Sequence, residues 1–380
     1  MKIQFVVSGL GIGGAERQVV LLAREFSRQG HSVSIYTLND LLIRSDELAG
    51  SSVEVVADQK RMRLDPAVLL RLRRHINAWK PDVIHSFLFD ADLYSRIAAI
   101  GLGLPVIGSE RSNAYRQKPI RRLAYWLTRN LTEGIVANSH AGASFAAAMH
   151  RLPRDRVHVI YNGIDLTEID ARLATASTAA HQIWPGNELK RVCVVGSIRP
   201  PKDYPLALRT AREAVDRDPS LRFICIGDAQ FDDPTDFTAG DYKATVMREF
   251  ERLGLKDHVA FVGRRHDVPE LMSSCDALLV TSAREGFPNV VLEAMACGTP
   301  VVSTDYSDVR RILPFAWQVV GSRDPVDLAL AIQRCIAERI DVSAAQRRWV
   351  ENNATILASA QSMRSVYERI CRPSAVARMA

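Results

Sequence analysis

The sequence lacks a long hydrophobic segment. No run of about 18 consecutive strongly apolar residues occurs, so we expect no membrane-spanning helix. The first residues are MKIQFVVSGLGIGGAERQ. The charged residues Glu16 and Arg17 interrupt the apolar segment too early for a secretory signal, and no small-residue cleavage site follows. We therefore expect the chain to be cytoplasmic.

Cysteine is scarce and scattered. The six cysteines include no C-x-x-C pair, which is the spacing common in zinc and redox sites. We expect buried free thiols in a reducing compartment, and neither a disulfide framework nor a zinc site. These residues are Cys193, Cys225, Cys275, Cys297, Cys335 and Cys371.

Length and composition indicate an ordinary globular protein of two domains. Apolar residues make up 47% of the chain and charged residues 24%, which excludes disordered and collagen-like classes. A chain of 380 residues is too long for one compact domain and suits two domains.

The net charge of +6 is concentrated in the first half. Residues 1–165 contain 22 Lys and Arg against 15 Asp and Glu, whereas the remainder is nearly neutral. A basic half favours an anionic partner such as a lipid surface, a phosphorylated substrate or a nucleic acid, and it is also compatible with a merely solvated basic face. No nucleic-acid-binding motif accompanies the charge, so we do not expect nucleic acid as a partner.

Short apolar segments alternate with helical ones along the chain. This alternation predicts α/β architecture with parallel sheets covered by helices. Asp65 and Pro66 stand in good N-cap and N1 order for a helix that runs to Trp79. Strands are expected at 2–8, 31–38, 52–57, 81–87, 104–109, 133–139 and 157–163 in the first half, and at 191–197, 221–227, 258–263, 275–282 and 299–304 in the second.

The alternation of strands and helices is interrupted once, and this interruption suggests the domain boundaries. Residues 171–190 include an Ala- and Thr-rich stretch and Trp184-Pro185-Gly186, which is typical of a linker. We expect an N-terminal domain over 1–170, a linker over 171–190, a C-terminal domain over 191–342 and an amphipathic helical segment over 343–372.

A glycine-rich loop, GLGIGG at 9–14, lies between the first strand and the first helix. Such a loop lets backbone N–H groups approach a phosphate closely. Gly9, Gly11 and Gly14 also match G-x-G-x-x-G, and Asp40 follows the second strand, so an NAD(P)-dependent oxidoreductase is one alternative. A tight turn that binds nothing is another.

The loop SIRPPKD at 197–203 follows the first strand of the second domain. Arg199 and Lys202 would stand at the carboxyl end of that strand, where open α/β sheets bind ligands. Two cations there suit a diphosphate. A solvated basic loop explains this segment equally well when it is considered alone.

The segment EGFPNVVLE at 285–293 is the most informative. Glu285 precedes a predicted helix and Glu293 lies about one turn inside it, so both carboxylates can face one site. Carboxylates accept hydrogen bonds from sugar hydroxyls, and the N–H groups of a helix N-terminus can bind a phosphate. A surface Glu followed by a helix Glu is the plain structural alternative.

The sequence also contains D-x-D at 90–92, a pattern used for metal binding in some sugar-transferring enzymes. It falls at a predicted helix start, where Asp90 is expected as an N-cap instead. We expect neither a metal nor a cofactor, and Asp232, Asp233 and Asp236 form a polar loop that needs no metal.

The segment EGFPNVVLEAMACGTPVVST resembles the donor-site signature of the retaining glycosyltransferases of family 4. Further segments fall in that family's order, so the resemblance covers nearly the whole chain. They are GIGGAE, PDVIHSF, IYNGID, SIRPPKD and the run from Val259 to Ser282.

This resemblance implies the GT-B fold, with two facing Rossmann-like domains and a cleft between them. The donor would be a nucleotide-sugar, with a UDP-sugar expected, and the acceptor a glycan or a lipid-linked molecule in cell-surface polysaccharide or glycolipid synthesis. Transfer would retain the anomeric configuration without a metal. A non-catalytic sugar-nucleotide binder and an oxidoreductase are the alternatives.

The resemblance also assigns site residues. Glu285, Arg199 and Lys202 would be catalytic: Glu285 near the reacting carbon, and the two cations on the diphosphate. Glu293 would hold the ribose, and the final helix would cross back to the first domain. The other substrate-binding residues would be Gly13, Gly14, Glu110, Arg111, Asn162, Ser197, Gly286, Phe287, Pro288, Asn289 and Val290.

Two loops depart from the family pattern. Many members have a His in the loop that here reads Ser109-Glu110-Arg111-Ser112-Asn113. The family often has a glycine pair and a Glu where this chain has 305–311, DYSDVRR, so donor contacts from that loop are not carried over. His85 ends a strand and fits either a site residue or a satisfied buried histidine.

Two basic stretches with apolar faces occur in the first domain. They fit an interfacial helix on an anionic membrane surface, which would make the protein peripheral on the inner face, and they fit two ordinary half-buried helices equally well. One contains Arg61, Arg63, Arg71, Arg73 and Arg74 among Met62, Leu64, Leu69, Leu70 and Leu72; the other contains Arg116, Lys118, Arg121, Arg122 and Arg129 around Ala124, Tyr125, Trp126 and Leu127.

Overall fold

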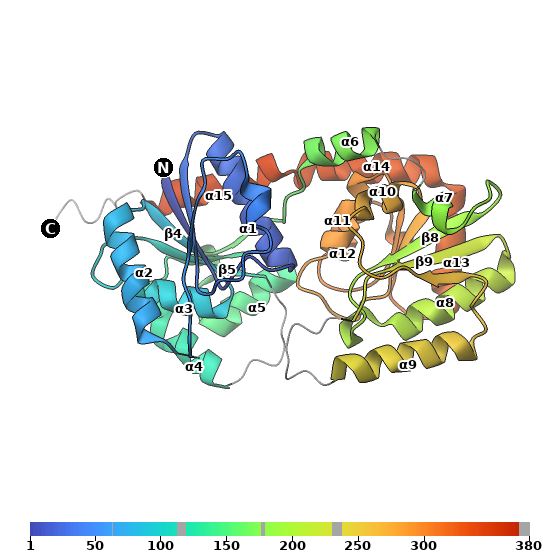
Figure 1. Ribbon diagram of the computed structural model, residues 1–380, viewed down its shortest axis with the longest axis horizontal. Helices are drawn as coiled ribbons and strands as arrows, with labels where there is room; N and C mark the ends of the chain where they lie inside the picture. The colour runs from blue at the N-terminus through green and yellow to red at the C-terminus, as the bar shows by residue number, and fades with distance from the viewer. Residues whose placement is uncertain (63, 112–118, 176–178, 230–237, 372–380) are drawn as a thin grey trace. The chain divides into compact units, whose positions relative to one another are not determined.

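The computed structural model describes residues 1–62, 64–111, 119–175, 179–229 and 238–371 (Figure 1). The described chain divides into two compact units. Unit 1 comprises Met1–Gly163 together with the residues from Ala354 onward, and unit 2 comprises Ile164–Asn353.

Unit 1 is built on a parallel sheet. Within the described residues it has seven strands in the order β3-β2-β1-β4-β5-β6-β7. The strands are β1 (Lys2–Val7), β2 (Ser32–Thr37), β3 (Glu54–Ala57), β4 (Val83–Phe87), β5 (Val106–Glu110), β6 (Gly134–Ala137) and β7 (Val157–Val159). Each lies within a predicted strand except β5, which extends one residue further to Glu110, because short β-branched runs buried on both faces are a strong local signal.

Helices cover both faces of this sheet (Figure 1). Ile3 and Phe5 of β1 pack in a cluster with α1 (Gly14–Arg28) and α15 (Ile356–Cys371). Val6, on the opposite face of the same strand, packs with α2 (Pro66–Trp79) and α3 (Phe89–Ala98). The alternation follows from the two-residue period of a strand. The helices α4 (Pro119–Thr128) and α5 (His140–His150) complete the unit.

Helix α2 begins as the sequence predicts. Asp65 is its N-cap, the Asp65 carboxylate accepts a hydrogen bond from the backbone N–H of Ala67, and Pro66 occupies the first turn. The pKa of Asp65 is lowered, chiefly by a hydrogen bond from the backbone N–H of Arg61 and also by the capping N–H of Ala67.

Unit 2 repeats this plan. Within the described residues, its sheet has six parallel strands in the order β10-β9-β8-β11-β12-β13. The strands are β8 (Lys190–Val195), β9 (Leu221–Ile226), β10 (Val259–Phe261), β11 (Ala277–Val280), β12 (Val301–Thr304) and β13 (Val319–Val320). The helices are α6 (Leu166–Ala174), α7 (Ala179–Ile183), α8 (Tyr204–Arg217), α9 (Thr238–Arg252), α10 (Val268–Ser273), α11 (Asn289–Ala296), α12 (Val309–Ile312), α13 (Pro325–Ala337) and α14 (Arg339–Asn353).

The segment expected as a linker contains structured elements of unit 2. Arg172 of α6 forms a bidentate salt bridge with Glu270 of α10. Its Nε and Nη2 atoms donate to the two carboxylate oxygens at 2.9 and 2.7 Å. The N–H of Ala180 in α7 donates to the Ser274 hydroxyl. The described parts of 171–190 therefore belong to the second unit, and the chain passes between the units at Gly163–Ile164.

The helical segment expected over 343–372 is two helices. Helix α14 belongs to unit 2, whereas α15 packs in unit 1 against α1. Gly163 permits this packing, because a Cβ there would lie 2.5 Å from Ile356 Cα. Gln18 completes the joint by exchanging two hydrogen bonds of 2.9 Å with the Gly163 backbone.

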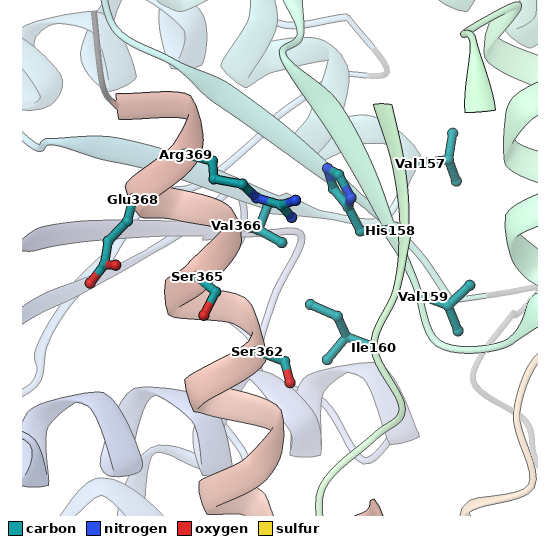
Figure 2. Close-up of a pocket in the computed structure, with 9 residues that line it drawn as sticks. All are labelled: Val157, His158, Val159, Ile160, Ser362, Ser365, Val366, Glu368 and Arg369. Carbon is teal, nitrogen blue, oxygen red and sulfur yellow. The ribbon is translucent and has the colours of Figure 1, made fainter. Parts of the chain in front are cut away.

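A surface pocket of about 660 Å³ lies between β7 and α15 (Figure 2). Arg369 extends from α15 towards His158 of β7, while Glu368 points away. Burial, and next the charge of Arg369, lower the pKa of His158. None of the residues predicted for the substrate site lines this pocket.

All six cysteines are free, as predicted, and all but Cys371 are buried. Among the described residues, the helices are too short or too polar to cross a membrane.

Candidate functional site

Two of the three predicted catalytic residues, Lys202 and Glu285, meet at one place on the sheet of unit 2. Strands β8 and β11 are neighbours, but the chain turns from β8 towards β9 and from β11 towards β12. The loops that follow these two strands therefore stand at the topological switch point of the sheet, the position at the carboxyl ends of the strands where open α/β sheets bind ligands. The first loop contains Lys202 and the second contains Glu285.

Lys202 and Glu285 form an ion pair at this end of the sheet. Lys202 Nζ lies 2.6 Å from Glu285 Oε1, and the hydroxyl of Ser282 donates to the same oxygen. The two side chains are 13% and 15% exposed, so water competes little for their ion pair.

Two glycines make room for Lys202. Gly196 directly follows β8 with φ +151°, and a Cβ there would lie 2.9 Å from Lys202 Cε. Gly227 directly follows β9, and a Cβ there would lie 2.1 Å from the Gly196 carbonyl oxygen. Any larger residue at either position would displace the lysine or the strand end.

The two loops are joined by hydrogen bonds. The hydroxyl of Thr281 donates to the carbonyls of Lys202 and Asp203 at 2.9 and 3.1 Å. The N–H of Ala283 donates to the carbonyl of Pro201 at 2.8 Å. The loops that contain Lys202 and Glu285 are therefore linked through their backbones.

A third chain segment holds both loops. Arg323 lies between β13 and α13, and its guanidinium donates to the Asp203 carboxylate at 2.6 Å. It also donates to the carbonyls of Ser282 and Thr281 at 3.1 and 3.2 Å.

Helix α11 begins at Asn289, as predicted, with Pro288 at its N-cap and no side chain capping it. Phe287 and Val290 are buried, and Glu293 lies in the second turn. The hydroxyl of Ser307 donates to the Gly286 carbonyl at 2.8 Å. The amide-rich start of this helix thus follows Glu285 directly, a suitable arrangement for binding an anion.

Arg199 and Ser197 lie in the same loop as Lys202. Arg199 is exposed and stands at the N-cap of the short 3-10 helix Pro200–Lys202. Ser197 is half-buried at the end of β8. Arg199 is near the ion pair in sequence, but its side chain is more accessible than that of Lys202.

In unit 1, the predicted residues follow the carboxyl ends of β1, β5 and β7. Gly13 is the N-cap of α1 and Gly14 is its first residue. Arg44 pins the glycine loop by donating to the carbonyls of Gly11 and Ile12 at 3.1 and 3.3 Å. The loop is therefore held as a turn ahead of the helix.

Arg111 lies in largely neutral surroundings. It donates to the amide oxygen of Asn162 and to the Ser109 hydroxyl, and it stacks 5.2 Å from the Phe87 ring centre. Burial lowers its pKa to about 10. Glu110 is 7% exposed at the end of β5.

His85 is a satisfied buried histidine. Its Nδ1 is 2.5 Å from the Tyr367 hydroxyl and its Nε2 is 2.7 Å from the Ser109 hydroxyl. Burial, followed by the charge of Arg111, holds its pKa well below the ordinary value. It supports Ser109 instead of acting as an acid or base at neutral pH.

The D-x-D segment is occupied by ion pairs. Asp92 is buried and accepts two hydrogen bonds from Arg96 at 3.0 and 2.7 Å, while Asp90 pairs with Lys60. The expected N-cap role of Asp90 is wrong, because α3 begins at Phe89 after Leu88 adopts φ +73°. Within the described residues no cluster of metal-binding side chains occurs. Asp232, Asp233 and Asp236 lie outside them, as do Ser112 and Asn113.

Sequence reasoning missed Ser282, Asp203 and Arg323. Ser282 carries a weak signal, since it is a polar residue directly after a buried strand. Asp203 precedes a helix and caps it, its carboxylate accepting from the Leu206 N–H at 3.2 Å. Arg323 carries no signal, because it is 120 positions from its partner.

Comparison with known families covers most of the chain. The family described as Glycosyltransferase Family 4 matches residues 12–168. The family described as Glycosyl transferases group 1 matches residues 179–355. The two matches fall on the two sheets described above.

Similar proteins are glycosyltransferases or act in polysaccharide synthesis. The D-inositol 3-phosphate glycosyltransferase of Streptosporangium roseum is 25% identical over 357 residues, covering 85% of this chain and 80% of that protein. The Vi polysaccharide biosynthesis protein VipC/TviE of Salmonella typhi is 25% identical over 355 residues, covering 80% of this chain and 59% of that protein.

Solved structures share the fold. HepE of Anabaena, crystallised in complex with UDP, matches with a TM-score of 0.79 and 22% identity, over 97% of this chain and 100% of that one. A glycosyltransferase of Rickettsia africae matches with a TM-score of 0.83 and 16% identity, over 98% and 99%. With its two Rossmann-like parallel-sheet domains, the chain therefore has the GT-B fold and belongs to glycosyltransferase family 4, the glycosyl transferases group 1.

Proposed function

We propose that this glycosyltransferase uses a nucleotide-sugar donor, with a UDP-sugar as the expected one, and retains the anomeric configuration. The observation that carries the proposal is the Lys202–Glu285 pair beside the start of α11. Support for the donor comes from HepE, crystallised in complexes with UDP and with UDP-glucose. An oxidoreductase is not proposed, since it gives no account of the segment 285–293.

On the donor side, Lys202 and Arg199 bind the diphosphate. The Lys202 ammonium has three donors, and its bond to Glu285 uses one of them. Ser197 and the segment from Gly286 to Val290 (Gly286, Phe287, Pro288, Asn289, Val290) line the phosphate and the sugar. Glu293 accepts hydrogen bonds from the ribose hydroxyls.

The charge changes of the reaction suit this arrangement. As the bond between the anomeric carbon and the diphosphate oxygen breaks, negative charge grows on the leaving group and positive charge on the sugar ring. Lys202 and Arg199 stabilise the first charge, and the Glu285 carboxylate stabilises the second. Fixed protein cations and helix amides can supply this stabilisation, so the proposed reaction needs no metal.

In unit 1, we assign substrate contacts to Gly13, Gly14, Glu110, Arg111 and Asn162. The two glycines approach the donor phosphate, and Glu110 and Arg111 contact the donor or the acceptor. Arg111 and Asn162 already hydrogen-bond to each other. The acceptor we propose is a glycan or a lipid-linked molecule of cell-surface polysaccharide or glycolipid synthesis, and support comes from the similarity to the Vi polysaccharide biosynthesis protein of Salmonella typhi.

A peripheral membrane position on the inner face is part of this proposal. Helix α4 exposes Ile120, Leu123, Trp126 and Leu127, which are three or four residues apart on one side. Arg122 is exposed beside them. An apolar stripe with flanking cations fits the surface of an anionic bilayer. Arg63, Arg116 and Lys118 lie outside the described residues.

The first experiment is a thermal-shift screen with UDP- and GDP-sugars, because a ligand that binds the folded state raises Tm. Donors that raise Tm are then assayed for nucleotide release and sugar transfer. A rise in Tm without turnover, with a panel of glycan and lipid-linked acceptors, would favour the non-catalytic binder. No rise with any donor would overturn the proposal.

A further inference from the structure

Two residues beside the proposed donor site have an unfavourable backbone. Asp203 has φ +47° and Arg323 has φ +54°, both in the left-handed region that side chains other than glycine's rarely adopt. Residues held this way persist only when their surroundings fix them, and they often mark functional sites. These two are ion-paired to each other at 2.6 Å.

The contacts of Arg323 span both catalytic loops. Its guanidinium binds the carboxylate of Asp203, the residue next to Lys202. It also donates to the carbonyl of Ser282, which lies in the loop that leads to Glu285. Its remaining described contact is the Thr281 carbonyl. The planar guanidinium carries donors on several nitrogen atoms, so it reaches both loops at once. A lysine ammonium carries its donors on one atom and would bridge the loops less well.

We propose that Arg323 is a positioning residue that sets the distance between Lys202 and Glu285. This inference rests on the proposed function of those two residues. Stability alone does not explain the arrangement, because Arg323 and Asp203 are 33% and 29% exposed and ion pairs with such access to water contribute little to folding.

Three substitutions test this role while keeping the left-handed backbone or the charge of the native residue. Arg323→Gly removes the guanidinium and at the same time suits the left-handed backbone, so it should leave the fold intact. Asp203→Asn removes the charge but keeps an oxygen able to cap α8 and tolerates the same φ. Arg323→Lys keeps the charge and loses the planar fork.

Positioning is measured first without any enzymatic assay. Trace labelling with acetic anhydride, followed by mass spectrometry, compares Lys202 with Lys190, which pairs with Asp218 at 2.7 Å elsewhere in unit 2. In Arg323→Gly, labelling of Lys202 should rise several-fold relative to Lys190. Unchanged labelling of Lys202 would overturn the proposal whatever the activity.

Kinetics supply the second readout. In Arg323→Gly and Asp203→Asn, kcat for sugar transfer should fall about 10- to 100-fold with the donor KM within about threefold and Tm nearly unchanged. Arg323→Lys should recover only part of kcat, and the double variant should lose no more than either single one. A kcat loss that merely follows the unfolded fraction would contradict positioning. If labelling responds as expected but the wild-type chain transfers no sugar, the proposed function fails and the inference on geometry stands.

Discussion

Lys202 Nζ and Glu285 Oε1 are 2.6 Å apart although 83 positions separate the residues in sequence. Their loops follow neighbouring strands, β8 and β11, and Ser282 donates to the same carboxylate oxygen. In the proposed reaction, a cation for the leaving group and an anion for the sugar ring are thus placed side by side. Such preorganisation lowers the reorganisation that the reaction itself requires.

Removing either member of this pair should slow transfer strongly. Lys202→Ala and Glu285→Gln should each cost about 2–4 kcal/mol of transition-state stabilisation, or about 30- to 1000-fold in kcat/KM. Steady-state kinetics with the best donor measure this. Arg212→Ala, which removes a surface ion pair on α8, is the control and should be nearly silent. Wild-type turnover in either catalytic variant would contradict its role.

Metal chelation should leave transfer unchanged. Asp92 is committed to Arg96, so the D-x-D segment does not offer it to a metal. Turnover in excess EDTA should equal that in Mg²⁺ or Mn²⁺. Asp92→Asn should act instead on stability, by roughly 3–5 kcal/mol, since it leaves the buried Arg96 charge without its partner. Loss of turnover on chelation, restored by a divalent ion, would disprove metal independence.

Acid should destabilise the fold through His150. Burial lowers its pKa from 6.5 to about 4, and its Nδ1 faces the Arg96 guanidinium at 3.0 Å. Between pH 6.5 and pH 4 the unfolded state binds more protons than the folded state. The stability that the neutral histidine contributes above pH 6.5 is therefore lost as the pH falls towards 4. The loss is roughly 3 kcal/mol. His150→Asn keeps an acceptor for Arg96 but cannot titrate.

Denaturant unfolding of wild type and His150→Asn at pH 7.5 and 4.5 isolates this contribution, because other groups titrate alike in both. The wild type should lose more stability than the variant between the two pH values. Equal losses would show that His150 does not carry the effect.

Gly163→Ala should loosen the joint between α15 and the rest of unit 1. A Cβ at this position would lie 2.5 Å from the backbone Cα of Ile356 and 2.9 Å from the Ser359 hydroxyl oxygen. Because backbone must move, we expect a loss of roughly 1–3 kcal/mol, measured by denaturant unfolding. Gly240→Ala, where a Cβ meets nothing within 4 Å, is the control and should be neutral or stabilising.

Flotation with vesicles tests the membrane proposal. The protein should float with phosphatidylserine-containing vesicles at low salt and less at high salt, because the attraction is partly electrostatic. Leu123→Glu combined with Leu127→Glu should abolish flotation. Leu330→Glu, which changes a leucine 50% exposed in unit 2, should not. A wild-type protein that stays unbound at low salt would end the proposal.

Features decided locally were predictable from sequence. The start of α2 at Asp65 and Pro66 and the start of α11 at Asn289 were predicted because caps and turn residues act within a few positions. The break between α14 and α15 was missed, since no proline or glycine marks it. The α3 start was misplaced because Leu88 adopts a left-handed φ that no residue type signals.

Site features that depend on tertiary pairing were only partly predictable. Family likeness brought Lys202 and Glu285 together, but it says nothing of Arg323, whose partner Asp203 lies 120 positions away. The roles of Ser282 and of the glycines at 196 and 227 likewise depend on which strands become neighbours. Periodicity predicts strands, but it does not specify which side chains meet beyond their ends.

The contact between Gly163 and Ile356 has a consequence for the architecture of the gene product. The chain leaves unit 1 at Gly163 and re-enters it near Ile356, which contacts Gly163. Residues 164–353 therefore form one continuous insertion in unit 1. That segment could therefore be exchanged for another α/β unit at two splice points that lie next to each other in unit 1.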